Sequence, residues 1–282
     1  DDRVLYVSLH RYGKDFFPGT GAADEVGEGK GEGYTVNIPF ETTGLGDLDY
    51  LAAYQVVIEP IGQKFKPDLV IVACGFDAAR GDPLGSMLLT PAGYYHLTAR
   101  ISANIQSKMT IVLEGGYNHT NVAKCSEAVV SAMLGDSVPL IRAGQDESLH
   151  PGTLKALKKV LRVQRRHWDC FDTPMHRAAS SGQLELADLN MSKQTAHLKK
   201  CAKERSQIHQ FGKVLPKGAK VKMRRGAKGS SLPFNFGDFD KVKASDVRKS
   251  SGGKRKRKDG SNEPDYKSLS IKVPNTKTGI GS

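Results

Sequence analysis

The sequence lacks any apolar run long enough to cross a membrane as a helix, which takes about 20 consecutive apolar residues. Its apolar content is also low: 38% of the residues are hydrophobic, whereas about 45–50% is usual in a compact domain. We therefore expect no contact with a membrane, and we expect an apolar domain joined to a polar segment.

Cysteine is scarce and scattered. The four cysteines, Cys74, Cys125, Cys170 and Cys201, show no paired spacing. Disulfide frameworks and zinc fingers both depend on regularly spaced cysteines, so the pattern argues against both. It predicts buried free thiols in a reducing compartment.

Residues 69–85 carry the clearest candidate site. They open with an apolar run, residues 69–74, which predicts a parallel strand buried on both faces. Asp77 follows just past the carboxyl end of this strand, where open α/β sheets place their ligands. The turn-rich loop at residues 81–85 is expected to form one wall of a pocket. The alternative is an ordinary strand with a polar exit, in which Asp77 caps the next turn.

Two other expected strands have similar exits. Residues 109–113 are a short apolar run followed by two glycines and Tyr117, and residues 4–9 are followed by His10 and the aromatic segment 16–21. Parallel strands bring their carboxyl ends to one edge of the sheet. The sequence therefore predicts a rim that presents an acid, a phenol, and a histidine with an aromatic pair.

Strands alternate with helices along residues 1–135, which predicts an α/β fold built on a parallel sheet. Asp47 is expected to cap the first helix, and Pro60 to kink that helix or end it early. A further strand is expected at residues 34–38. Helices are expected at residues 47–65, 90 to about 107, and about 121–134, and Gly135 is expected to end the last of them.

Residues 154–168 form a basic amphipathic pattern, with leucines and Val160 on one face and lysines and arginines on the other. Surface helices of globular proteins commonly have this pattern, and we expect this helix to pack on the domain. The alternative is a segment that binds calmodulin or a membrane surface.

The character of the chain changes after residue 170. Residues 172–182 resemble the opening of one ankyrin repeat, but a single repeat cannot bury its own apolar face. Residues 171–193 are therefore interpreted as either a single ankyrin-like segment or a linker.

Lys, Arg, Gly and Ser dominate residues 194–282, which predicts a disordered basic tail. Basic clusters at residues 220–228 and 254–258 are typical of nuclear localisation or of nucleic-acid contact. The alternative is a solvated tail that carries no localisation signal.

Three segments, SLHRYGKDFFPGTGAADEVG, GFDAARGDPLG and LEGGYN, resemble in order the zinc-dependent histone deacetylase family, class II type. The resemblance covers about residues 1–170, interpreted as the C-terminal part of a catalytic domain. It implies an arginase/deacetylase-like parallel sheet with helices on both faces. It also implies deacetylation of acetyl-lysine in histones or other proteins, chromatin regulation with a co-repressor complex, and a location in the nucleus with shuttling to the cytoplasm.

The resemblance implies roles for particular residues. Asp77 matches a zinc ligand, and Tyr117 matches the phenol that donates to the substrate carbonyl oxygen. Phe17 and Gly115 match the walls of the tunnel that holds the lysine stem, while Leu84 matches a rim residue. The family also holds structural potassium, for which the matching residues are Ser8 and Leu9 at one site and Tyr34 at another.

One departure from the family pattern concerns histidine. The family's His-His general base and its Asp-x-His zinc ligands do not occur among the eight histidines of this sequence. A catalytic zinc takes about three protein ligands, so the chain alone is expected to be inactive. Residue 1 is expected to lie inside the catalytic domain, downstream of a segment that carries those ligands and part of the sheet.

Three hypotheses remain at this point. The chain is the C-terminal portion of a nuclear class II lysine deacetylase, or a catalytically inactive remnant that acts as an interaction protein. The third is a nucleic-acid-binding protein driven by the basic tail and the net charge of +12. This third hypothesis leaves the three ordered motifs without explanation.

Overall fold

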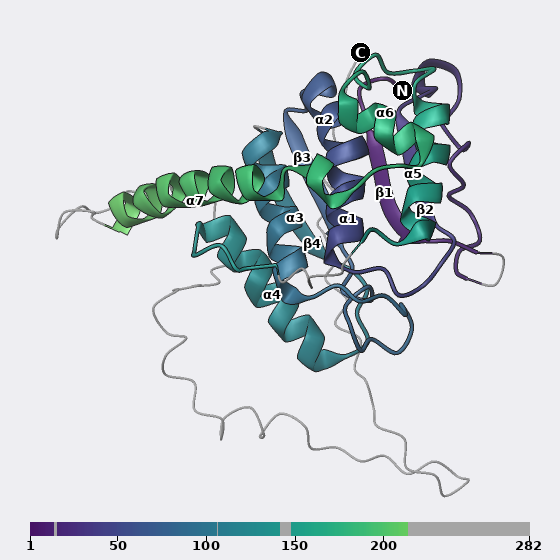
Figure 1. Cartoon of the computed structure of the whole chain (residues 1–282). Helices are drawn as coiled ribbons and strands as arrows, with labels where there is room; N and C mark the ends of the chain where they lie inside the picture. The colour runs from purple at the N-terminus through teal and green to yellow at the C-terminus, as the bar shows by residue number, and fades with distance from the viewer. Residues whose placement is uncertain (14–15, 106, 142–147, 214–282) are drawn as a thin grey trace, which may run out of the picture. The chain divides into compact units, whose positions relative to one another are not determined.

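The computed structural model describes residues 1–13, 16–105, 107–141 and 148–213 (Figure 1). The chain divides into two units, Asp1–Ala219 and Lys220–Ser282, and every described residue belongs to the first. The strands are β1 (Tyr6–Arg11), β2 (Thr35–Phe40), β3 (Leu69–Cys74) and β4 (Lys108–Leu113). The helices are α1 (Asp47–Ala53), α2 (Glu59–Phe65), α3 (Pro91–Asn104), α4 (His119–Leu134), α5 (Pro151–Gln164), α6 (Pro174–Ser181) and α7 (Met191–Lys213). Shorter turns are η1 (Gly29–Gly31), the π-helical η2 (Tyr54–Ile58) and η3 (Leu186–Leu189).

The strands form two parallel pairs. β1 pairs with β2 from Tyr6 opposite Thr35 onward, and β3 pairs with β4 from Leu69 opposite Lys108 onward. The predicted α/β fold with parallel strands is confirmed. Because paired parallel strands end on the same side, the loops after β3 and β4 leave the sheet together.

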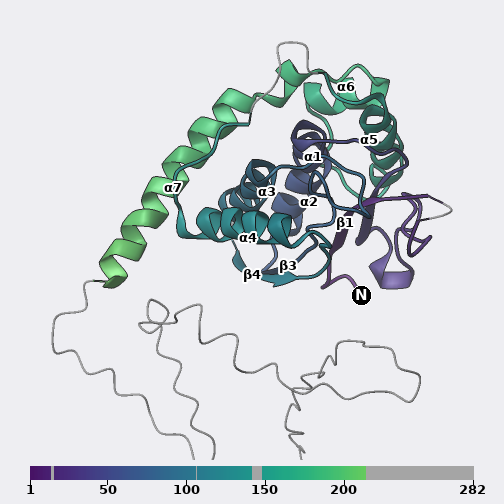
Figure 2. The ribbon, with the colours of Figure 1, turned by 90° about the horizontal axis from the view of Figure 1, so that it is seen from below.

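The two pairs are not hydrogen-bonded to each other within the described part of the chain. A cavity of about 1130 Å³ is lined by all of β1 and all of β3. Figure 2 shows β3 and β4 at the lower edge of the fold, with α3 and α4 above them. On the face of β3 that points away from these helices, Ile71 is 66% exposed. The prediction that β3 is buried on both faces is therefore wrong for the described residues, because helices cover only one face.

β2 and the helix that follows it form the centre of the core. Val36, Ile38 and Phe40 are fully buried. Gly46, not Asp47, is the N-cap of α1, so the predicted cap is wrong by one position. The Asp47 carboxylate instead accepts hydrogen bonds from the backbone N–H of Thr90 at 2.7 Å and from its hydroxyl at 2.6 Å. This side chain therefore joins the start of α1 to the start of α3.

The sequence predicts that Pro60 kinks its helix or ends it early, but the helix does not end there. The helix passes from α1 through the wider π turn η2, in which the Glu59 N–H donates to the carbonyl of Tyr54, and continues in α2 to Phe65. Pro60 stands in the first turn of α2, the position where a missing N–H is best tolerated. The π turn thus separates the proline from a regular helix interior.

α3 and α4 confirm the two predicted helices, although α3 ends at Asn104 rather than at about residue 107 and α4 begins at His119 rather than at about residue 121. The Thr90 hydroxyl accepts from the backbone N–H of Gly93 at 3.3 Å and caps α3. α4 ends at Gly135, whose φ of 79° lies in the left-handed region that glycine adopts readily. All four cysteines are free thiols, but only Cys74 and Cys125 are buried as expected, whereas Cys170 and Cys201 are half-buried. Burial raises the pKa of Cys74 and of Cys125 to about 11.

α5 packs on the core, which confirms the first of the two interpretations of the basic amphipathic pattern. Leu157, Val160 and Leu161 are fully buried, while Lys155 on the opposite face forms an exposed ion pair with Glu41 at 2.8 Å. The indole N–H of Trp168 donates to the carbonyl of Gly33 at 3.0 Å.

The segment after residue 170 continues the same core. Phe171, Ala179, Leu184 and Leu189 lie in one apolar cluster with β2 and α5. His176 of α6 is buried, and its Nε2 lies 3.1 Å from the carbonyl oxygen of Val56. The ankyrin-like residues thus pack on this domain as a helix.

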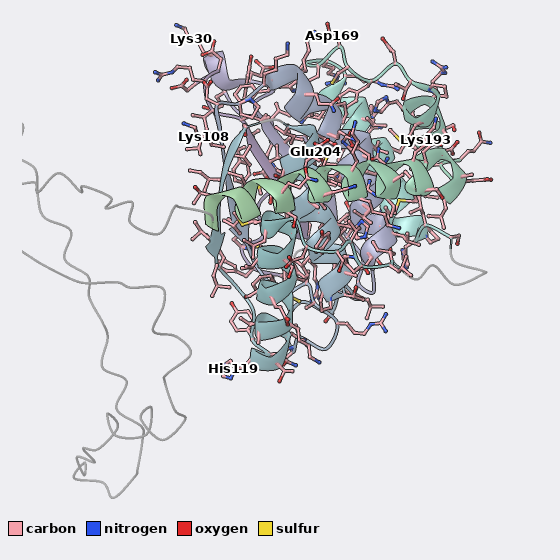
Figure 3. The ribbon with its side chains drawn as sticks, turned by 90° about the vertical axis from the view of Figure 1, so that its left-hand side faces the viewer. Lys30, Lys108, His119, Asp169, Lys193 and Glu204 are labelled. Atoms are coloured by element: carbon pink, nitrogen blue, oxygen red, sulfur yellow. The ribbon has the colours of Figure 1, made fainter. Side chains whose placement is uncertain are left out.

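α7 changes the prediction for the tail. Residues 194–213 are helical and not disordered, and Figure 3 shows α7, with Lys193 and Glu204 labelled, lying across α3 and α4. Leu198 is buried in a small cluster with Tyr95, Ala99 and Ala132. This contact with two other helices stabilises a polar segment that could not order itself alone. The predicted disorder and the basic clusters of residues 214–282 lie outside the described residues.

Among the described helices, none combines the length and the apolar character that crossing a membrane requires.

Candidate active site

The predicted rim is built from the loops that follow β1, β3 and β4. Asp77 follows β3, and two glycines line its carboxylate. A Cβ atom built on Gly75 would lie 2.9 Å from Asp77 Oδ1, and one built on Gly115 would lie 3.4 Å from Asp77 Cγ. The structure thus brings Asp77 and Gly115 together from loops that follow different strands.

The surroundings of Asp77 restrict its backbone as well. A Cβ on Gly85 would collide with the carbonyl oxygen of Asp77, so only glycine fits where the loop returns. The Tyr94 hydroxyl donates to the carbonyl of Gly75 at 3.0 Å. Burial, with a further contribution from the negative charge of Asp77, raises the pKa of the Tyr50 hydroxyl, which therefore stays protonated.

The loop that carries Leu84 is organised by Asp82. This carboxylate is 8% exposed. Its Oδ1 accepts from the backbone N–H of Leu84 at 2.9 Å and of Gly85 at 3.2 Å. Its Oδ2 accepts from the backbone N–H of Tyr117 at 2.8 Å. Asp82 therefore joins the loop after β3 to the loop after β4.

Arg11 joins the third loop to these two. Its guanidinium donates to the carbonyl oxygen of Leu84 at 3.1 Å and of Gly85 at 3.4 Å. It also lies over the ring of Phe16, 4.3 Å from the ring centroid, at a distance typical of a cation–π contact. The aromatic segment after β1 is thereby held against the Leu84 loop.

His10 supports the aromatic segment from inside. Its Nδ1 lies 2.8 Å from the Ser8 hydroxyl, and its Nε2 lies 3.0 Å from the carbonyl oxygen of Gly21. A carbonyl only accepts, so Nε2 carries the proton and Nδ1 accepts from Ser8. Burial lowers the pKa of His10, which favours this neutral form. Nε2 therefore holds the loop at Gly21, while Nδ1 bonds Ser8 on the same strand.

The side chains predicted to meet a substrate are exposed on this rim. Phe17 is 89% exposed, Tyr117 is 57% exposed, and Leu84 is 53% exposed. Neither the phenol nor the phenyl ring is needed to fill the core. This exposure leaves both free to contact a ligand.

The residues predicted to hold potassium fall in two places. Ser8 and Leu9 lie on β1, half-buried, with Ser8 bonded to His10. Tyr34 precedes β2 and packs edge-to-face between Phe65 and Trp168, with ring centroids 5.9 Å and 5.4 Å apart. The backbone of Tyr34 is bonded to Tyr6 at the start of the β1–β2 pair, while Ser8 and Leu9 lie further along β1 opposite Asn37 and Ile38.

Asp77 has no partner set for a metal in the part of the chain that the structure describes. No group of three or more His, Cys, Asp and Glu side chains that could hold a metal ion occurs there. A catalytic zinc takes about three protein ligands and one open position. The described residues alone therefore do not fit such a zinc.

Sequence reasoning missed Arg11 and Asp82. The Asp-Pro pair at residues 82–83 is a recognisable turn signal, and it indicates that Asp82 bonds the backbone two residues on. Nothing local indicates its bond to Tyr117, 35 residues away, or the bond from Arg11 to Leu84, 73 residues away.

Comparison with known proteins gives consistent matches. A family model described as the histone deacetylase domain matches residues 1–133. Histone deacetylase 15 of Arabidopsis thaliana is 52% identical over 166 residues, covering 58% of this chain and 30% of that protein. Histone deacetylase HDA1 of Saccharomyces cerevisiae is 41% identical over 186 residues, covering 64% of this chain and 26% of that protein.

A solved structure agrees with these relatives. The structure of the histone deacetylase Clr3, a Schizosaccharomyces pombe protein, matches with a TM-score of 0.57 and 44% identity. The match covers 60% of this chain and 29% of that chain. The chain thus spans less than a third of the length of each of these three relatives.

Proposed function

Because residues 1–133 belong to the histone deacetylase domain family, we propose that this chain supplies the C-terminal portion of a class II lysine deacetylase site. The substrate class is acetyl-lysine in histones or other proteins. The observation that carries the proposal is the rim itself: Asp77 lies against Gly115 at the ends of β3 and β4, and Asp82 bonds the loop after β3 to the backbone of Tyr117 in the loop after β4.

Tyr117 is the residue with a direct part in the reaction. Hydrolysis of an amide places negative charge on the carbonyl oxygen, and a fixed donor stabilises that charge. The exposed phenol of Tyr117 is proposed as such a donor, and the backbone of Tyr117 is bonded to Asp82 in the loop that follows Asp77. Phe17 and Gly115 are proposed to flank the aliphatic stem of the lysine, and Leu84 to form the lip.

Asp77 is proposed as one zinc ligand. The described residues supply no further ligands to accompany it, so we assign no catalytic step to the metal. Ser8 and Leu9, and separately Tyr34, are proposed to hold structural potassium through oxygen atoms, the donors that hard cations prefer.

The open strand edges support the proposal that another segment completes the sheet. β1 pairs only with β2, and β3 only with β4, among the described residues. The cavity between them is lined by both strands, and unpaired strand edges take up further strands readily. We propose that a segment bearing the Asp-x-His ligands and the His-His base pairs there.

A fusion tests this function. The segment of Arabidopsis histone deacetylase 15 that precedes its region of similarity to this chain is joined ahead of residue 1, and turnover of an acetyl-lysine peptide is measured. We expect turnover from the fusion, and a kcat lower by about 10²–10³ in Tyr117→Phe, with inhibitor binding retained. A Tyr117→Phe variant within a few-fold of the parent would reject the catalytic role.

One observation favours a second candidate function, a non-catalytic interaction protein. No group of three metal ligands occurs among the described residues. A fusion that folds and binds zinc yet turns over no acetyl-lysine peptide would favour this candidate. For both candidate functions we propose a location in the nucleus. The proposed partners are a co-repressor complex and nucleic acid, the latter contacted by the basic tail.

A further inference from the structure

Tyr117 is not fixed by its own surroundings. Its side chain is more than half exposed, so packing does not hold it. Two glycines precede it, and Gly116 adopts a φ of +130°, a backbone conformation that side-chain-bearing residues rarely adopt. After it, Asn118 begins α4 as the N-cap. Tyr117 therefore lies on a short bridge between two glycines and the start of a helix.

The backbone N–H of Tyr117 itself is bonded to the opposite loop through one carboxylate. The N–H of Tyr117 donates to Oδ2 of Asp82 at 2.8 Å. The other oxygen of the same carboxylate accepts from Leu84 and Gly85. Hydrogen bonds to an ionised acceptor are stronger than neutral ones, and Asp82 is itself buried. One carboxylate thus holds the backbone of Tyr117 and the backbone of residues 84 and 85.

Neighbouring bonds keep Asp82 itself in place. The side-chain amide of Asn118 donates to the carbonyl of Gly81 at 3.1 Å, and that of Asn121 donates to the carbonyl of Arg80 at 2.9 Å. These bonds tie residues 80–81 to the start of α4 without the Asp82 carboxylate. A variant of Asp82 therefore loses the bond to Tyr117 while the two segments stay attached.

We propose that Asp82 is a positioning residue for Tyr117: it holds the phenol in register with Asp77 and couples it to the lip at Leu84. The proposal rests on the proposed function for its effect on turnover, and on the geometry alone for its effect on Tyr117. A displacement of about 1 Å in a reacting group can cost about 10²-fold in rate. Asp82 acts through Tyr117 and does not contact the reacting atoms.

The first test uses the 282-residue chain and needs no activity. Hydrogen–deuterium exchange of the peptide that contains Tyr117 is followed by mass spectrometry in Asp82→Asn, with Glu114→Gln as the control. Glu114 is an exposed carboxylate on the same loop. We expect exchange at Tyr117 about tenfold faster in Asp82→Asn, since one charge-assisted bond is lost, and no change in Glu114→Gln. Unchanged exchange in Asp82→Asn overturns the proposal.

The second test uses the fusion described above. Asp82→Asn should lower kcat about 10–100-fold with KM changed less than about threefold, and the double variant with Tyr117→Phe should be no slower than Tyr117→Phe alone. Additive losses overturn the proposal, because Asp82 would then act by a route other than Tyr117. If Asp82→Asn does not fold, Asp82→Glu, which keeps the charge but moves the oxygens, is measured in both tests against the same criteria. An inactive parent fusion overturns the proposed function, while the exchange result still decides the positioning.

Discussion

The guanidinium of Arg11 donates to the carbonyl oxygen of Leu84 at 3.1 Å, across 73 residues of sequence. The same group lies over the ring of Phe16. Arg11 thereby holds the aromatic segment after β1 against the lip of the site. With Asp82, it makes one bonded chain from Phe16 to Tyr117.

Arg11→Lys should loosen the aromatic segment. Lysine keeps the charge but lacks the planar fork that reaches two carbonyls and lies flat on a ring. We expect faster proteolysis within residues 16–19 and a free energy of unfolding lower by about 0.5–1.5 kcal/mol. The matched control is Arg3→Lys, since Arg3 forms an exposed pair with Asp1. Equal protease sensitivity of the two variants would contradict the role of Arg11.

Asp49 should be a strong contributor to stability. Its buried carboxylate accepts from the N–H of Gly46 at 3.0 Å, the N–H of His150 at 2.9 Å and the hydroxyl of Thr153 at 2.8 Å. It therefore joins the start of α1 to the start of α5. Asp49→Asn leaves at least one of these donors without an acceptor, and we expect a loss of about 1–3 kcal/mol in urea unfolding.

The control for Asp49 is Asp169→Asn. Asp169 pairs with Lys64 at 2.9 Å on the surface, where ion pairs contribute little. The urea unfolding midpoint of the Asp169→Asn variant should stay close to that of the parent chain. An Asp49→Asn midpoint equally close to the parent would refute the link between α1 and α5 as a stabilising contact.

Stability should fall in mild acid through buried histidines. Burial is the main cause that lowers the pKa of His176, whose ring nitrogens bond Thr173 and Val56. The unfolded chain therefore binds this proton more readily than the folded chain. The stabilisation is fully present above the unfolded pKa of about 6.5 and is lost as the pH falls toward the lower folded value.

The measurement is the urea midpoint at about pH 7.5 and about pH 5.5, on either side of the unfolded pKa. The midpoint should drop in acid, and His176→Gln should show a smaller drop. Substituting the exposed His119 with Gln should leave the full pH dependence. The same dependence in His176→Gln as in the parent would exclude His176 as a source.

Substitution of Asp77 should lower the zinc content of the fusion, whereas substitution of Tyr117 should lower only its kcat. We expect the 282-residue chain to bind no stoichiometric zinc and the fusion to bind one zinc, measured by elemental analysis. In the fusion, Asp77→Asn should lower zinc content and turnover together, because a carboxylate ligand is lost. Tyr117→Phe is the control and should keep its zinc. Full zinc occupancy in Asp77→Asn would remove Asp77 from the ligand set.

Residues 254–258 should direct nuclear import, since five consecutive basic residues form a recognisable address. A fluorescent fusion with alanine at all five positions should move from the nucleus to the cytoplasm. The control replaces three lysines of α7 with alanine, namely Lys199, Lys200 and Lys203. An unchanged nuclear signal in the first variant would defeat the assignment.

The sequence by itself determined the local elements and the residues at the strand ends. Thr90 before a proline, and Gly135 after an apolar helix, mark helix ends through their own backbone chemistry. Short apolar runs followed by Gly, Asp or Tyr placed Asp77 and Tyr117 at the exits of parallel strands. These features depend on a few adjacent residues, so a local pattern is enough to predict them.

Tertiary structure decided what no local pattern contains. The bonds of Asp82 to Tyr117 and of Arg11 to Leu84 join residues 35 and 73 positions apart, and only the packing of the strands brings them within reach. The same holds for α7, whose polar sequence predicts disorder but whose Leu198 finds a buried site on α3 and α4. An apolar run such as β3 likewise indicates a strand, whereas its exposed face depends on which elements cover it.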